Sequence, residues 1–197
     1  MKFFNNSHEP EIIIQYASLI DPVATYYVKN HPLTKKFGWH DWTPPDKKEI
    51  EQRVESYKEE WKKHTIVRDI SKTLNLSFRR NAIDVYVVSG ALRATSRPII
   101  ISSTEKPKQF VVTLAHELIH QILANNNMPI IAFGENESNR TNSHIIVNAV
   151  LKKVLHEELW SIACSAKSKF SSKEYARARE LSEKIGADEV IKKYRPT

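Results

Sequence analysis

Residues 105–125 read EKPKQFVVTLAHELIHQILAN, a run of helix-forming residues that is apolar on most sides. Such a pattern predicts a helix buried in the core of the fold. The preceding Ser102-x-x-Glu105 resembles a capping box, and the asparagines from Asn125 onward favour the end of the helix. Two histidines and a glutamate lie in its middle, where burial is costly without a partner. The segment therefore predicts a functional site within the core.

The motif His116-Glu117-x-x-His120 carries the chemistry. Residues four apart on a helix are rotated by only about 40°, so both imidazoles point the same way. Neutral imidazoles at this spacing bind Zn²⁺, and we expect one zinc ion per chain. Glu117 lies about 100° around the helix from His116, where it reaches a water better than the metal, so we expect it to be the general base. The alternative is a pair of core histidines bonded to backbone, with Glu117 exposed.

A catalytic zinc site needs a third protein ligand, and His144 is the leading candidate. We expect it at the start of the next helix, which runs from His144 to about Ser161. The apolar run after His144 indicates that this helix packs against the first one. Three histidines and a water form an open, catalytic site. Glu137 and, less well placed, Glu135 are the alternatives in the loop before this helix.

The octapeptide TLAHELIH, residues 113–120, resembles the active-site helix of zincin metallopeptidases. The resemblance covers roughly residues 99–155. It implies a small sheet, an active-site helix beneath it and a third ligand from a following helix. A histidine as that ligand is similar to SprT-like proteases, whereas a glutamate is similar to the small minigluzincins. Leu123 and Asn126 stand where a metzincin has glycine and histidine, so that group is excluded.

The composition bounds the fold. With 197 residues, of which 41% are hydrophobic, the chain is long enough for one domain with its own core. Only four glycines argue against an all-β fold. The single cysteine, Cys164, excludes a disulfide framework and a cysteine-rich zinc ribbon. We expect a mainly helical α+β fold, a small zincin fold with a short β-sheet next to the motif helix.

We divide this single zincin-like domain into an N-terminal helical part (residues 1–75), the sheet and zinc-binding helices (76–161) and basic C-terminal helices (162–197). One helix is expected at residues 11–20 and a second at 22–30, with Asp21 as its cap. A loop is expected at 31–45, and a third helix begins at Pro44 with Thr43 as its cap. The third of these carries the apolar stripe Ile50, Val54, Tyr57 and Trp61, and helix continues through Val67, Ile70 and Leu74.

Two strands are expected in the central part, at residues 82–88 and 98–102, with a loop at 91–97 between them. Pro98 suits an edge strand, because an edge tolerates the missing N–H. Asn142 or Ser143 is expected to cap the helix that begins at His144. Gly186 is expected to break the C-terminal helices.

The predicted function is a zinc-dependent metallopeptidase acting on a protein or peptide substrate. Two alternatives stay open, a SprT-like DNA-associated protease and a catalytically idle zincin-fold binding module, although the intact Glu117 argues against the second. The edge formed by Ile99, Ile100 and Ile101 is expected either to hold an extended peptide by strand addition or to be an ordinary buried strand. A donor is also needed for the oxyanion, and the chain offers several of the right type: Tyr86, Arg140, His156, Tyr175 and Tyr194.

The formal net charge of +7 permits contact with nucleic acid without establishing it. No stretch has the roughly 18 apolar residues of a membrane span, and residues 1–10 lack the apolar segment of a secretory signal. We therefore expect a cytoplasmic protein without membrane contact. The sequence gives no indication of the oligomeric state.

Overall fold

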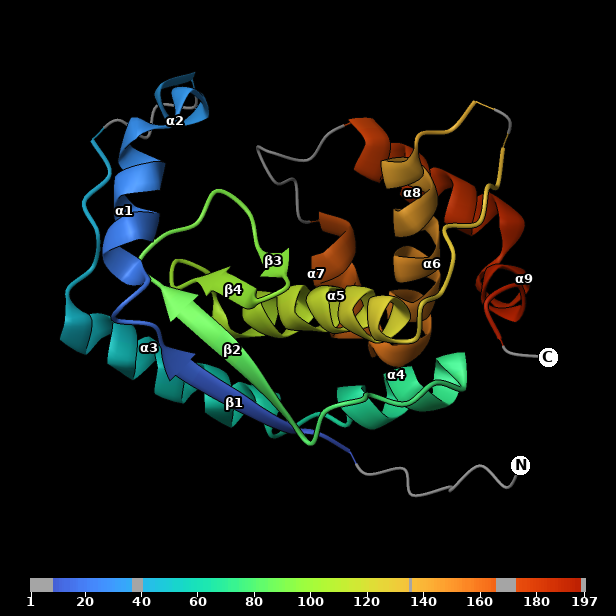
Figure 1. The fold of residues 1–197 in the computed structure, drawn as a ribbon, viewed down its shortest axis with the longest axis horizontal. Helices are drawn as coiled ribbons and strands as arrows, with labels where there is room; N and C mark the ends of the chain where they lie inside the picture. The colour runs from blue at the N-terminus through green and yellow to red at the C-terminus, as the bar shows by residue number, and fades with distance from the viewer. Residues whose placement is uncertain (1–8, 37–40, 135, 166–172, 196–197) are drawn as a thin grey trace.

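The computed structural model describes residues 9–36, 41–134, 136–165 and 173–195. Within these ranges the fold is a mainly helical α+β arrangement with a four-stranded mixed sheet, as predicted (Figure 1). The strands lie in the order β1-β2-β4-β3. They are β1 (Glu11–Tyr16), β2 (Ala82–Val88), β4 (Ile99–Ser102) and the two-residue β3 (Thr95–Ser96). The first three run parallel, and β3 is antiparallel to β4.

The first element is a strand, so the helix predicted at residues 11–20 is wrong. Ile12, Ile13 and Ile14 are β-branched, and such residues lose side-chain freedom in a helix but pack well on a strand. In β1, Ile14 is buried and pairs with Val85 of β2. The N-terminal part is therefore not only helical, because it supplies one strand to the central sheet.

The segment predicted as a loop at residues 91–97 contains β3, which occupies the side of β4 that we expected to be open. Thr95 pairs with Ile100, and Ser96 pairs with Ile99. Pro98 is accommodated because it stands in the turn between β3 and β4 rather than within either strand. Among the described residues, the open edge on this side of the sheet therefore belongs to β3.

The helices of the N-terminal half are α1 (Asp21–Asn30), α2 (Pro32–Lys36), α3 (Lys47–Trp61) and α4 (Ile66–Leu74). Both caps predicted here are wrong. Asp21 is the first residue of α1, and its carboxylate accepts hydrogen bonds from the N–H and the hydroxyl of Ser89. The cap of α3 is Asp46 rather than Thr43, because Asp46 accepts a hydrogen bond from the N–H of Glu49 at 2.8 Å.

The apolar stripe of α3 faces the core as predicted. Ile50, Val54 and Tyr57 are buried, and Trp61 is half-buried against them. The predicted loop at residues 31–45 also contains α2, and its residues 37–40 lie outside the described part of the chain.

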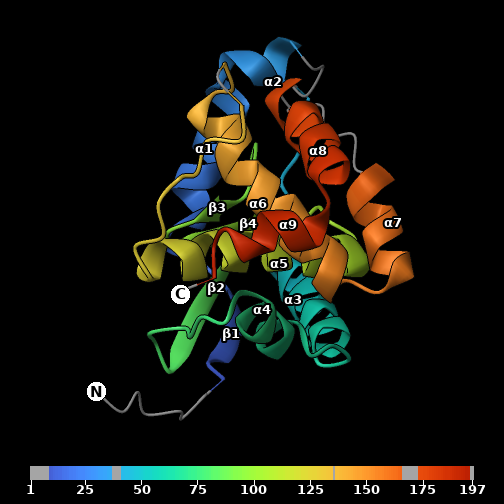
Figure 2. The ribbon, with the colours of Figure 1, turned by 90° about the vertical axis from the view of Figure 1, so that its right-hand side faces the viewer.

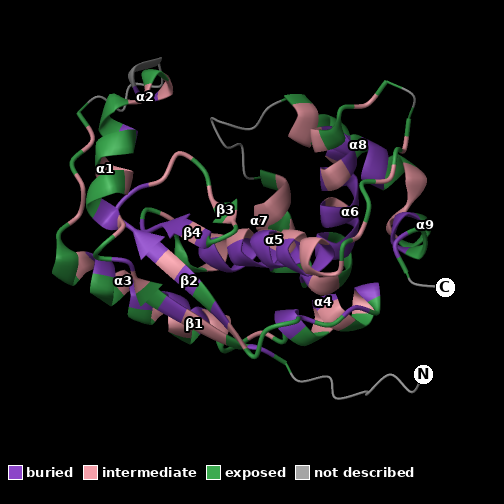
Figure 3. Ribbon diagram, viewed as in Figure 1, coloured by how far each residue is buried: buried purple, intermediate pink, exposed green. Residues whose placement is uncertain are grey.

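The central helix is α5 (Pro107–Asn125), which ends where the sequence predicted. It begins at Pro107, and Ser102 and Glu105 do not form the expected capping box. Instead, the Ser102 hydroxyl accepts a hydrogen bond from the N–H of Thr104 at 3.2 Å. Most of α5 is buried (Figure 3), and it packs against α3, α6, α7, β3 and β4.

The next helix, α6 (Asn139–Val154), begins earlier and ends earlier than predicted. Its cap is Ser138, whose hydroxyl accepts a hydrogen bond from the N–H of Thr141 at 3.1 Å. The predicted caps Asn142 and Ser143 lie inside the helix. A separate helix, α7 (Glu157–Ser165), follows, so His156 is not on the helix of His144. His144 thus lies in the second turn of α6.

The C-terminal helices α8 (Lys173–Ile185) and α9 (Ala187–Lys192) are divided at Gly186, as predicted. Both pack against α6 (Figure 2). In Figure 1 the sheet and α3 lie to the left, α6, α8 and α9 lie to the right, and α5 crosses between them. In the described part of the chain, no helix has the length and apolarity needed to span a bilayer.

Candidate metal centre

Three imidazoles converge where α6 packs against α5. The Nε2 atom of His120 lies 3.1 Å from Nε2 of His116 and 3.3 Å from Nε2 of His144. Two nitrogen ligands on a tetrahedral zinc ion are separated by about 3.3 Å, since each metal–nitrogen bond is about 2.0–2.1 Å long. The three histidines expected as ligands are therefore close enough to hold one metal ion.

Glu137, the alternative third ligand, does not belong to this group. Its Oε1 accepts a hydrogen bond from Nε of Arg177 in α8 at 2.9 Å. Within the described residues, the atoms that gather as a ligand set come from the three histidines alone. Glu135 lies outside the described part of the chain.

The backbone of α6 fixes the orientation of His144. Its Nδ1 lies 2.7 Å from the carbonyl oxygen of Arg140, which can only accept a hydrogen bond. Nδ1 therefore carries the proton, and the lone pair of Nε2 faces His116 and His120. Metal-binding histidines commonly have their second ring nitrogen held in this way.

Burial keeps the three imidazoles neutral. The pKa of His116 is well below its ordinary value because burial disfavours the cation and because His120 and His144 would repel it. Burial, then His144 and then Arg97 lower the pKa of His120 to about 3. Burial also lowers the pKa of His144, although the hydrogen bond to Arg140 opposes the effect. The neutral imidazole is the form that binds metal, so the donor set fits a metal ion.

Glu117 is buried beside the histidines, with 8% of its surface exposed. The alternative with an exposed Glu117 is therefore wrong. Burial and, second, the charge of Glu105 raise the pKa of Glu117 to about 7. Burial likewise raises the pKa of Glu105 to about 7, against the effect of a hydrogen bond with Thr113. Glu105, which precedes α5, and Glu117 within α5 are thus two carboxyl groups with raised pKa values.

The histidines and Glu117 line a pocket of about 340 Å³. Residues 94–97, which include β3, form another part of the lining, and Tyr175 of α8 completes it. The Tyr175 ring centroid lies 4.2 Å from that of His144. The guanidinium carbon of Arg140 lies 5.0 Å from the Tyr175 ring centroid, and Nη2 of Arg140 lies 3.4 Å from its hydroxyl. Two oxyanion candidates are therefore adjacent, with Tyr175 in the pocket.

The other candidates for the oxyanion do not line this pocket. The Tyr194 hydroxyl accepts a hydrogen bond from the N–H of Ile131 at 3.1 Å. The His156 ring stacks on that of His64 at a centroid distance of 5.3 Å. Tyr86 lies in β2 and pairs with Gln15 and Ile100.

Comparison of the chain with models of protein families, with curated proteins and with solved structures gives no match in any of the three. The resemblance of residues 113–120 to a zincin active-site helix therefore stays a prediction from the motif. What the site can do is inferred from the geometry of the three histidines and from the chemistry of the side chains around them.

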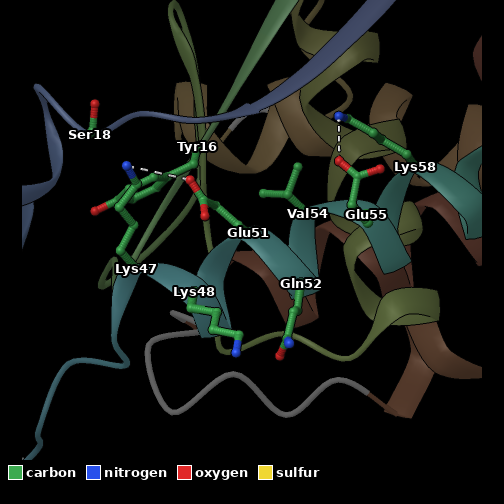
Figure 4. Close-up of a pocket in the computed structure, with 9 residues that line it drawn as sticks. All are labelled: Tyr16, Ser18, Lys47, Lys48, Glu51, Gln52, Val54, Glu55 and Lys58. Carbon is green, nitrogen blue, oxygen red and sulfur yellow. Dashed lines mark hydrogen bonds and ion pairs between the residues drawn. The ribbon is translucent and has the colours of Figure 1, made fainter.

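A larger pocket, of about 570 Å³, lies between the end of β1 and α3 (Figure 4). Its lining includes Lys47, 3.7 Å from Glu51, and Lys58, 2.7 Å from Glu55. No histidine or cysteine is among the residues that line it. Exposed lysine–glutamate pairs along a helix are typical of a solvated face, so we assign this pocket no chemistry.

Proposed function

We propose that this protein is a zinc-dependent metallopeptidase. The observation that carries the proposal is the convergence of the Nε2 atoms of His116, His120 and His144 beside the buried carboxyl group of Glu117. These groups line one pocket, so a substrate can reach both the metal position and the carboxyl group.

Zinc is the metal we propose, because three neutral imidazoles suit its ligand preference and leave a fourth position open. When bound, zinc would supply Lewis acidity, which polarises a peptide carbonyl and makes a water more acidic. One ion per chain is expected from one set of ligands.

The side chains of this protein would divide the remaining work. Glu117 accepts the proton of the attacking water and passes it to the leaving amine. The Tyr175 hydroxyl donates a hydrogen bond to the oxygen on which negative charge develops. The nearby Arg140 cation favours that charge, and its guanidinium group lies over the Tyr175 ring and contacts the hydroxyl.

The substrate would lie along β3. We expected an extended peptide at the edge of β4, but β3 occupies that position. The unpaired edge of β3 borders the pocket, since Thr95 and Ser96 line it together with the histidines. A peptide that adds to this edge would therefore border the pocket that the three histidines line.

Cleavage of an unfolded protein, such as casein, tests the proposal. We expect the wild-type protein to cut it, to lose activity on chelation and to regain activity with zinc. Glu117→Gln should keep one zinc per chain and lose about 10²- to 10⁴-fold in rate, because the proton acceptor is gone. The matched control Glu183→Gln, at an exposed position, should behave as wild type.

Two results would overturn the proposal. One is a wild-type protein that takes up no zinc from a zinc-containing buffer. The other is a zinc-loaded protein with no cleavage, or with cleavage that Glu117→Gln leaves intact. The same assay with and without DNA tests the SprT-like alternative, in which cleavage would increase when DNA is present.

A further inference from the structure

We propose that Arg97 selects substrates that place a carboxylate beside the scissile peptide bond. This inference rests on the proposed peptidase function and adds a substrate class to it. Arg97 directly follows β3 and lines the same pocket as the three histidines and Glu117.

The side chain of Arg97 is exposed, and among the described residues no carboxylate forms an ion pair with it. Arg97 lines the same pocket as His120. A guanidinium group without an acidic partner is therefore one of the residues that line the pocket.

Two arginines of α6 and α8 have acidic partners, unlike Arg97. Arg140 lies 3.8 Å from a carboxylate oxygen of Glu174, and Arg177 binds both Glu137 and Glu180. These two cations are already neutralised by side chains of α8 and its surroundings. Arg97 differs from them, since its charge is left for a ligand from outside.

Glu117 is the one carboxyl group among the residues that line the pocket. Glu117 cannot serve as a permanent partner of Arg97 while it accepts a proton. The five donors of an arginine form a planar fork that fits a carboxylate with two parallel hydrogen bonds. A substrate carboxylate is therefore the ligand that this position fits.

The position of Arg97 also favours a peptide over a nucleic acid. A peptide along β3 passes Arg97 at the end of the strand, so an acidic side chain or a C-terminal carboxylate can reach it. A nucleic acid backbone would need several unpaired cations along one groove. The described residues that line the pocket include one such cation, Arg97.

The experiment uses a synthetic peptide library in which half of the peptides end in a carboxylate and half in an amide. The zinc-loaded Glu117→Gln protein is immobilised, and the retained peptides are identified by mass spectrometry. This variant binds without cutting, so the readout does not depend on activity. The same selection is made with Arg97→Gln, with Arg97→Lys and with Arg93→Gln, each in the Glu117→Gln background. Arg93 is the matched control, since it is exposed on the same segment but does not line the pocket.

We expect one of two enrichments among the retained peptides, by roughly 10- to 100-fold. Either Asp and Glu are enriched at one position over Asn and Gln, or peptides with a free C-terminus are enriched over those with an amidated one. Arg97→Gln should abolish this ratio, Arg97→Lys should preserve part of it, and Arg93→Gln should leave it unchanged. Enrichment confined to the carboxylate-ended half identifies a C-terminal carboxylate, whereas enrichment of Asp and Glu in both halves identifies an acidic side chain.

The inference is overturned if neither Asp and Glu nor free C-termini are enriched, if the enrichment persists in Arg97→Gln, or if single-stranded DNA displaces the peptides through Arg97. Each of these outcomes is compatible with cleavage of neutral peptides by the wild-type protein. Conversely, selective retention without any cleavage by wild type would support the role of Arg97 and contradict the proposed function. The two failures are therefore distinguishable.

Discussion

The Nδ1 atom of His144 donates a hydrogen bond to the carbonyl oxygen of Arg140, one turn earlier in α6, at 2.7 Å. This contact links the metal centre to the backbone of a helix that begins at Ser138. Because the imidazole is held by its own helix, Nε2 faces α5 before any metal arrives. The site is thus arranged in advance by the packing of two helices.

His144→Ala should therefore reduce zinc affinity by more than about 100-fold, since even partners that only orient a ligand commonly contribute 10- to 100-fold. Glu137→Gln should bind zinc as wild type does, because Glu137 binds Arg177 instead. Zinc titration with a competing chelator measures both affinities. Unchanged affinity in His144→Ala would assign the third ligand to another residue.

Tyr175→Phe should lower kcat by about 10²-fold with little change in zinc affinity or KM, because it removes a donor that acts only as charge develops. The ring itself, which packs 4.2 Å from His144, is retained in this variant. Tyr26→Phe, at an exposed position on α1, is the control. A change in KM alone would indicate substrate binding in place of oxyanion stabilisation.

Asp21→Ala should destabilise the fold by about 2–4 kcal/mol. The buried carboxylate of Asp21 accepts hydrogen bonds from the N–H of Ser89 at 2.5 Å, from its hydroxyl at 2.6 Å and from the Tyr16 hydroxyl at 2.8 Å. Its removal leaves buried donors unsatisfied, which is costly. Asp46→Ala removes only an exposed helix cap and should cost about 1 kcal/mol. Urea unfolding of both variants checks this order, and equal losses would contradict it.

The three histidines that gather at the candidate metal centre were predictable from patterns within two helices. His116, Glu117 and His120 follow from the geometry of one helix, and His144 from the apolar run that buries the next. Arg97 and Tyr175 were not singled out, because they reach the pocket through tertiary contacts of β3 and α8. No spacing along the chain encodes those contacts.

The fold was predictable in class, but the first strand was not. A short apolar run such as Ile12–Ile14 is compatible with either a helix or a buried strand. Its partner in the sheet, β2, begins only at Ala82, so the pairing that decides between them is distant in sequence. The start of α6 was missed for a similar reason, since Thr141 and Asn142 are polar residues that tertiary packing buries.

Glu105 gives a pH dependence of stability that can be isolated by mutation. Burial raises the pKa of its carboxyl group to about 7, from an ordinary value of 4.5. Its contribution to stability is therefore complete below about pH 4.5 and is lost as the pH rises through 7, because the unfolded chain releases the proton more readily. Glu105→Gln mimics the protonated form and avoids this loss.

The stability of the Glu105→Gln variant relative to wild type should increase by at most about 3 kcal/mol between pH 5 and pH 8.5. Urea unfolding with EDTA at both pH values measures this difference, while Glu183→Gln, at an exposed position, should show none. A difference that stays constant with pH would mean that Glu105 ionises as freely in the folded protein as in the unfolded chain.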